Sequence, residues 1–262
     1  MRRLLTFATL FTSLLPLPSA AAEVSTQGEL ETAWEDSSVS TITIASSIEI
    51  KDCGEAWNAG ASSITLVSKT GTEQLHLSSS DIGQKAYAQM IAGENTEVSI
   101  KNLSLKNDDT VHLLQAASVT LNNVTIASSS KQSAAAAVNA TNITLTGKLT
   151  LDLNTPCNTL LSCSGSLTCS TDYSGITINI SDDFSLGSGG VTNLILFSGT
   201  APSKVEDLKC AITGASGYYV VLKNMQGGTV LCLEAPEPGS ATLTLIGLIA
   251  LLHRRRRPRA AA

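Results

Sequence analysis

Arginine is missing from the middle of this 262-residue chain. All seven arginines lie in its first three or its last nine residues, so the body between them, Glu23 to Ala235, has only ten lysines as permanent cations. The same body holds 21 acidic residues, which gives it a formal charge of −11. This charge argues against nucleic acid or an anionic lipid surface as a partner, because both ligands attract basic proteins.

Sequence motifs for catalysis are equally scarce. The chain has no Gly-x-Ser-x-Gly elbow, no phosphate-binding glycine loop and no Cys-x-x-Cys pair, and only 4% of its residues are aromatic. The body contains two histidines, His76 and His112, and neither lies near the run of Cys157, Cys163 and Cys169, so a zinc site is not expected. We therefore expect no catalytic residue, no metal and no cofactor.

Long apolar runs are confined to the two ends. At the N-terminus, Met1 to Arg3, an apolar run from Leu4 to Leu17 and the small residues up to Ala22 have the order of a secretory signal peptide. The apolar run is too short to span a bilayer. We expect residues 1–22 to be removed, with cleavage after Ala20 or Ala22.

The C-terminus combines three features in order. A Pro-Glu-Pro triplet is followed by an uncharged apolar stretch, Ala241 to Leu252, and then by a basic run. The triplet is Pro236, Glu237 and Pro238, and the run is Arg254, Arg255, Arg256 and Arg257. The apolar stretch is marginal for a permanent span, and the arginines behind it would stay on the cytoplasmic side of the membrane.

This order of residues resembles the PEP-CTERM sorting signal of Gram-negative bacteria. The resemblance covers residues 236–259, and we assign residues 236–262 to a sorting tail with a short transmembrane helix. It implies Sec export, a transient stay in the inner membrane and cutting near the triplet by an exosortase, a membrane cysteine peptidase. It also implies a cell-surface or extracellular location, with the arginine run as the membrane-retention cluster. An ordinary C-terminal anchor without a cut is the alternative.

The cysteines all lie in the exported body. Their even number, six, favours disulfides in an oxidising compartment. We expect one bridge between Cys210 and Cys232, closing the C-terminal region, and another within the Cys157–Cys169 cluster.

The body repeats a strand pattern. Residues 98–105, 119–126 and 138–145 alternate apolar residues with Ser or Thr around an asparagine, and the aligned asparagines are Asn102, Asn123 and Asn142. Such alternation indicates strands with one face inward, and short strands about every 20 residues indicate a parallel β-helix. The asparagines would form a structural ladder there, because Asn tolerates a left-handed bend and can bond to the Asn of the next coil.

A helix is predicted before the first strands. Within Gln27–Glu35, the residues Leu30, Ala33 and Trp34 have the spacing of one amphipathic face. A helix followed by Thr-Ile-Thr-Ile resembles the N-terminal cap of right-handed β-helix proteins, the pectate-lyase-like class. We therefore predict an all-β fold with this capping helix: a right-handed parallel β-helix over residues 23–190 and a C-terminal β capping unit over 191–235. A β-sandwich is the alternative.

Two classes of function suit such a fold. Many β-helix proteins are polysaccharide lyases or glycosidases, but the body lacks arginine, the commonest lyase base together with lysine. Its acidic pairs, Asp108-Asp109 and Asp182-Asp183, are adjacent in sequence and fit solvated turns better than the facing carboxylates of a glycosidase. We predict a structural or adhesive surface or matrix protein rather than an enzyme, with an envelope polysaccharide as candidate partner. A polysaccharide-active enzyme is the alternative.

Overall fold

The computed structural model describes residues 20–79, 87–129, 134–169, 175–186 and 191–235. Most of the predicted signal peptide and the whole predicted sorting tail, with its Pro-Glu-Pro triplet, apolar stretch and arginines, lie outside these residues. No helix in the described part is long and apolar enough to cross a membrane.

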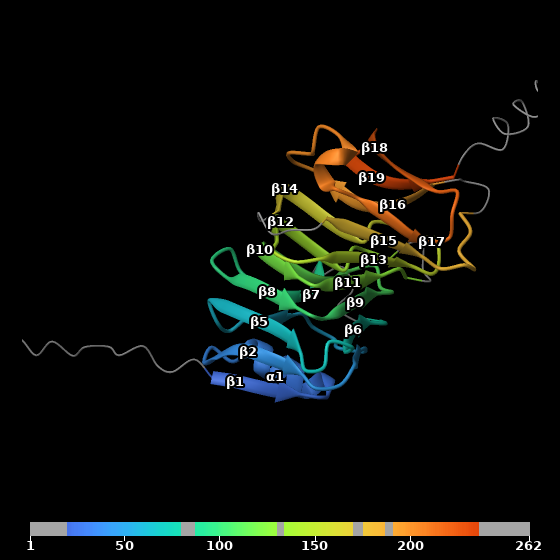
Figure 1. Ribbon diagram of the computed structural model, residues 1–262. Helices are drawn as coiled ribbons and strands as arrows, with labels where there is room; N and C mark the ends of the chain where they lie inside the picture. Colours follow the sequence, from blue (N-terminus) through green and yellow to red (C-terminus); the bar gives the residue numbers. More distant parts are fainter. Residues whose placement is uncertain (1–19, 80–86, 130–133, 170–174, 187–190, 236–262) are drawn as a thin grey trace, which may run out of the picture.

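The chain winds as a right-handed parallel β-helix, as predicted, and not as a β-sandwich (Figure 1). Along each coil a strand of a twelve-stranded sheet is followed by a strand of a seven-stranded sheet. The larger sheet contains β1 (Ala20–Val24), β2 (Val39–Ile44), β4 (Trp57–Asn58), β5 (Ser63–Ser68), β7 (Ala88–Ile91), β8 (Glu97–Lys101), β10 (His112–Asn122), β12 (Val138–Leu145), β14 (Leu161–Cys169), β16 (Val191–Phe197), β18 (Tyr219–Met225) and β19 (Gly228–Glu234). The smaller sheet contains β3 (Ile48–Ile50), β6 (Gln74–Leu77), β9 (Ser104–Asn107), β11 (Val124–Ala127), β13 (Leu149–Leu153), β15 (Ile176–Ile180) and β17 (Ala211–Gly214). In the larger sheet, β1, β4, β7, β18 and β19 have no counterpart in the smaller sheet.

The core is a set of apolar columns inside the coils. In one column each side chain pairs in register with the next, and all of its members are at most 1% exposed: Ile42, Leu66, Ile100, Leu121 and Leu145. Stacking buries these side chains because a single coil has no partner for its apolar face. Burial of each such side chain stabilises the fold by about 1.5–3 kcal/mol relative to exposure.

A helix closes the N-terminal end of the columns. Helix α1 (Gln27–Glu35) begins with a capping box, in which Thr26 accepts from the Glu29 amide and Glu29 accepts from the Thr26 amide. Its buried face is Leu30, Ala33 and Trp34, as the spacing predicted. Trp34 is fully buried and donates its Nε1 hydrogen to the Trp57 carbonyl at 3.1 Å.

The strand pairing changes at the C-terminal end. Strand β16 pairs in parallel with β14, but β19 pairs antiparallel with both β16 and β18. A 3₁₀ turn at Val205–Leu208 lies between β16 and β17. The two antiparallel strands therefore end the larger sheet beyond the parallel coils, while the predicted domain boundary at residue 190 lies outside the described residues.

The third sequence repeat does not stack on the first two in the alignment that the sequence pattern indicated. Val119 pairs with Val98 as aligned, but its partner in the next coil is Ile143 rather than Val138. The reason is that β12 begins early, on the segment of the coil where Val138 pairs with Leu114. The alternation alone cannot distinguish the part of β12 that pairs with residues 114–116 from the part that pairs with residues 118–121.

Asn142 consequently lies outside the asparagine ladder. Asn102 and Asn123 occupy the left-handed region with φ of 52° and 53°, and the Asn123 side-chain amide donates to Asn102 Oδ1 at 3.3 Å. Asn142 instead lies within β12, where its Oδ1 accepts from the Ser166 hydroxyl at 3.0 Å. In the next coil Gly147 stacks against Asn123, since a Cβ there would lie 2.8 Å from the Asn123 backbone nitrogen.

Candidate functional site

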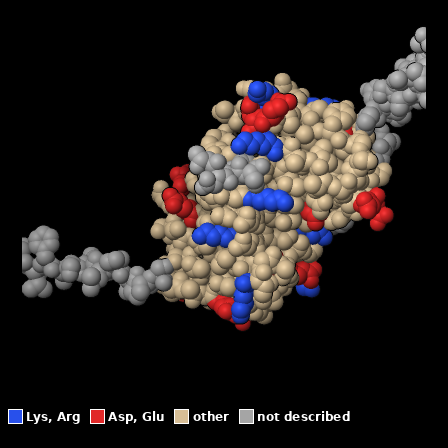
Figure 2. Space-filling view, viewed as in Figure 1, with Lys and Arg blue, Asp and Glu red and all other residues tan. Residues whose placement is uncertain are grey.

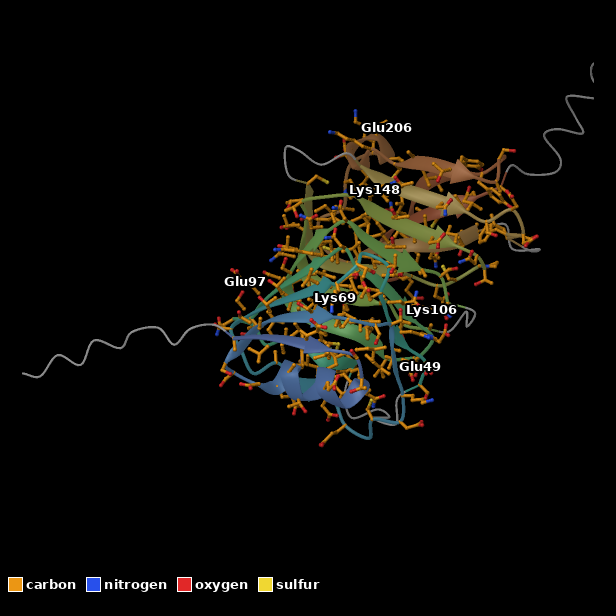
Figure 3. The ribbon with its side chains drawn as sticks, turned by 60° about the horizontal axis from the view of Figure 1, so that its bottom comes forward. Glu49, Lys69, Glu97, Lys106, Lys148 and Glu206 are labelled. Carbon is orange, nitrogen blue, oxygen red and sulfur yellow. The ribbon has the colours of Figure 1, made fainter. Side chains whose placement is uncertain are left out.

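A group of polar side chains gathers on the outer face of the smaller sheet in the first coils. His76 of β6 pairs in register with Lys106 of β9, and Asp108 directly follows β9. Ser129 comes from the next coil, two residues after β11. We call these four residues the Asp108 cluster; Figure 3 labels its Lys106, near Glu49 of β3.

Asp108 is the acceptor for all the other members of the cluster. Its Oδ2 lies 2.9 Å from His76 Nε2 and 3.3 Å from Lys106 Nζ, and its Oδ1 accepts from the Ser129 hydroxyl. Burial alone would raise the pKa of Asp108, but hydrogen bonds from Ser129, His76 and Lys106 lower it to about 2. The carboxylate is therefore ionised at any pH above about 4.

The sequence interpretation of Asp108 as a solvated turn residue is wrong. Asp108 is 9% exposed, because the strand register of β6, β9 and β11 covers it with donors from three successive coils. Its neighbour Asp109 does behave as a turn residue, since its Oδ1 accepts from the Val111 amide at 3.2 Å. No sequence signal separates the two carboxylates, because the donors to Asp108 come from up to 32 residues away.

The geometry of the Asp108 cluster favours a structural role over catalysis. In a catalytic triad a histidine lies between the carboxylate and the nucleophile, whereas here the carboxylate lies between the histidine and the serine. Each carboxylate oxygen already accepts a hydrogen bond, so Asp108 is a poor general base with a pKa of about 2. The cluster joins three coils on the outside of the sheet.

The second body histidine is also held in the framework. His112 begins β10, and its Nδ1 lies 3.1 Å from the Ala136 carbonyl. Burial lowers the pKa of His112, and this hydrogen bond opposes that shift without reversing it. His112 is therefore neutral at pH 7.

A row of lysines follows one corner of the β-helix, where each larger-sheet strand turns into a smaller-sheet strand. Lys69 follows β5, Lys101 ends the neighbouring strand β8, Lys148 precedes β13, and Lys209 lies beside Gly175 two residues before β17. We call these four exposed residues the lysine column. Figure 2 shows lysines spaced from one end of this face to the other, with acidic residues at its margins.

Most of the charges in the lysine column are not paired with a carboxylate. Lys69 is paired with Glu23 at 2.6 Å. Among the described residues, no carboxylate lies within ion-pair distance of Lys101, Lys148 or Lys209. Three of the four column lysines are thus exposed cations without a paired carboxylate, on a body of net charge −11.

Farther along the smaller sheet the outward side chains are uncharged or acidic and bond to one another. Asn179 of β15 donates to Asp152 of β13 at 2.9 Å, and Thr213 of β17 donates to Asn179 at 3.4 Å. Within the part of the chain that is described, no three His, Cys, Asp or Glu side chains are arranged to hold a metal ion.

The predicted disulfide partners lie in different parts of the fold. All six cysteines are thiols in this structure. Cys210 directly precedes β17 of the smaller sheet, whereas Cys232 is buried in β19 of the larger sheet, with its Sγ 3.4 Å from Asn193 Oδ1. The structure does not bring Cys210 and Cys232 together as a pair.

Comparison with known proteins relates the N-terminal half of the chain to an adhesive domain. A family model described as a pectate lyase-like adhesive domain matches residues 21–150, just under half of the chain. The matched segment runs from β1 into β13 and includes the Asp108 cluster and three residues of the lysine column. No curated protein and no solved structure matches the chain.

Proposed function

We propose that this chain is an exported, non-catalytic adhesin of a Gram-negative bacterial surface or matrix. The observation that carries the proposal is the match of residues 21–150 to an adhesive domain, in coils where the buried carboxylate of Asp108 already accepts hydrogen bonds at both oxygens. The two ends of the sequence supply the route: a signal peptide for Sec export and a tail that resembles an exosortase substrate.

The tail is tested by intact mass and C-terminal peptide mapping of the protein from its native cells. Loss of residues up to about Ala22 and a new C-terminus near Pro236 would support sorting by an exosortase. A mature chain that still ends at Arg259 or Ala262 would contradict it and leave an ordinary membrane anchor.

The lysine column is the surface that we propose for contact with an acidic envelope polysaccharide. Lys101 and Lys148 are two coils apart, and so are Lys148 and Lys209; at about 4.8 Å per coil, a column spaced in this way can follow an extended polyanion along the molecule. Association would release counterions, and the affinity would therefore fall as salt rises.

A charge-reversal pair tests this contact. In Lys101→Glu/Lys148→Glu we expect at least a tenfold loss of affinity for an acidic polysaccharide purified from the same envelope, measured by biolayer interferometry at low salt. The control is Lys51→Glu/Lys223→Glu, which makes the same change in net charge at two exposed lysines outside the column, paired with Glu49 and Glu234. Equal loss in both variants would mean that only net charge matters and would remove the column as the contact surface.

The enzymatic alternative has its own assay. Incubation with the same polysaccharide, followed by measurement of new reducing ends and of unsaturated products, is expected to show no turnover. Turnover that a single substitution such as Asp108→Asn abolishes would overturn the non-catalytic proposal.

A further inference from the structure

Four of the six thiols have a polar partner other than cysteine. Cys53 lies 3.3 Å from Gln27 Nε2, Cys157 contacts Thr192, Cys163 donates to the Thr141 carbonyl at 3.4 Å, and Cys232 donates to Asn193. Three of them are buried, and a buried thiol is poorly accessible to an oxidant. Cys169 and Cys210 are the remaining two, one exposed and one half-buried.

The strand register brings Cys169 and Cys210 to the same corner. Cys169 is the last residue of β14, and β15 continues the same coil after Gly175. Cys210 belongs to the next coil and lies level with Ile176, because Ala211 pairs with Thr177. A Cβ at Gly175 would lie only 2.3 Å from the Lys209 carbonyl oxygen, so the segment that holds Cys210 passes directly over this corner.

The two thiols also interact electrostatically. Burial, and then the neighbouring Cys169, raise the pKa of Cys210 to about 11. Burial raises the pKa of Cys169 as well, and the Lys209 ammonium partly offsets that rise. Adjacent coils are about 4.8 Å apart along the stack; Cys169 ends β14 and Cys210 is level with Ile176, so the bridge would join the two sides of this corner as well as the two coils.

We propose that Cys169 and Cys210 form a disulfide that fastens the last coil to the preceding one in the exported protein. The proposal rests on the export inferred above, which brings the chain to an oxidising compartment. It replaces the Cys210–Cys232 pairing and leaves the other four cysteines reduced.

The oxidant is the disulfide of an extracytoplasmic thiol–disulfide oxidoreductase. The exposed Cys169 thiolate attacks it, forms a mixed disulfide and releases one oxidant thiol. The Cys210 thiolate then attacks Cys169 Sγ and releases the second. Two electrons and two protons pass from the cysteine pair to the oxidant, which leaves as a dithiol.

Alkylation in denaturant tests the pairing. Trypsin cleaves after Lys209 and Lys223, so Cys210 is the single cysteine of its peptide. In protein purified after export we expect the Cys210 peptide to stay unalkylated before reduction and to be alkylated after it. In Cys169→Ser we expect Cys210 to react without reduction, whereas in the control Cys163→Ser, on the same strand, it stays protected.

Other results would overturn the proposal. Release of Cys210 by Cys232→Ser rather than by Cys169→Ser would restore the pairing expected from the sequence. A Cys210 that is alkylated without reduction in exported protein would show that no bridge forms.

A second experiment separates this inference from export. Reduced protein, refolded and oxidised with glutathione disulfide, should form the Cys169–Cys210 bridge whatever its native location. We expect this bridge to raise the Tm by several degrees, because it closes a loop of about 40 residues. If the bridge forms in vitro but Cys210 is reduced in native cells, the result would contradict export of the protein and not the pairing of Cys169 with Cys210.

Discussion

Asp108 shows how a single side chain acquires its properties from neighbours in other coils. Its carboxylate is flanked by Asp109 in the sequence, yet its partners His76 and Ser129 come from the coils before and after it. The pKa of Asp108 is therefore lowered only where the neighbouring coils are stacked in this register.

Asp108→Asn is expected to destabilise the protein at pH 7 by about 1–3 kcal/mol, because it removes charge-assisted hydrogen bonds from a buried group. The pKa of Asp108 is lowered from 3.8 to about 2, so its contribution is present above pH 4 and is lost as the pH falls toward 2. Urea denaturation from pH 7 to pH 2 should show the difference between wild type and variant shrinking over that window. Asp182→Asn, at an exposed turn, is the control and should show no such convergence.

Asn123 has both a left-handed backbone and side-chain hydrogen bonds, and two variants separate these roles. Asn123→Gly keeps the backbone conformation at no steric cost and loses only the hydrogen bonds. Asn123→Ala loses both and should be about 1 kcal/mol less stable than Asn123→Gly in urea denaturation. Equal stability of the two variants would mean that the backbone at residue 123 leaves the left-handed region in Asn123→Ala without cost.

At the scale of elements, the sequence was informative wherever a pattern is local. The helix at Gln27–Glu35 and its buried Trp34 follow from spacing within nine residues, and the alternation of β5, β8 and β11 follows from spacing within six. The phase of β12 did not follow, because two segments of a coil show the same alternation. The Asp108 cluster did not follow either, since its members are adjacent only after the coils stack.

The inward column of β10 supports a prediction about these elements. Leu121→Ala should cost about 2–5 kcal/mol, because Leu121 packs between Ile100 and Leu145 and its removal leaves a cavity. Thr120→Ala, on the outward face of the same strand, should cost less than about 1 kcal/mol. Thermal unfolding of both variants measures the difference; equal Tm shifts would contradict the inward and outward assignment.

At the scale of the whole molecule, the β-helix is a stack whose ends differ. The N-terminal end is closed by α1 and β1, whereas at the C-terminal end the larger sheet finishes in the antiparallel strands β19 and β18 and the smaller sheet in β17 (Figure 1). An uncovered coil offers unpaired amide and carbonyl groups to a second molecule. The caps are therefore expected to keep the chain monomeric.

Deletion of residues 20–36 should expose β2 and cause association that increases with concentration. Size-exclusion chromatography with light scattering would detect it, and circular dichroism would check that the remaining coils are folded. The control begins at Glu23, as expected after removal of the signal peptide, and keeps α1. A folded, monomeric deletion variant would show that the cap is not needed for solubility.

The direction of the backbone hydrogen bonds has a mechanical consequence. In this stack the backbone hydrogen bonds run along the long axis, from coil to coil. A pull between the two ends therefore breaks them a few at a time, as in unzipping, rather than many at once in shear. Coils would then detach one after another, each releasing roughly 24 residues, as between Ile42 and Leu66, and about 80 Å of chain. Under such a pull the chain would yield gradually, coil by coil, and lengthen severalfold.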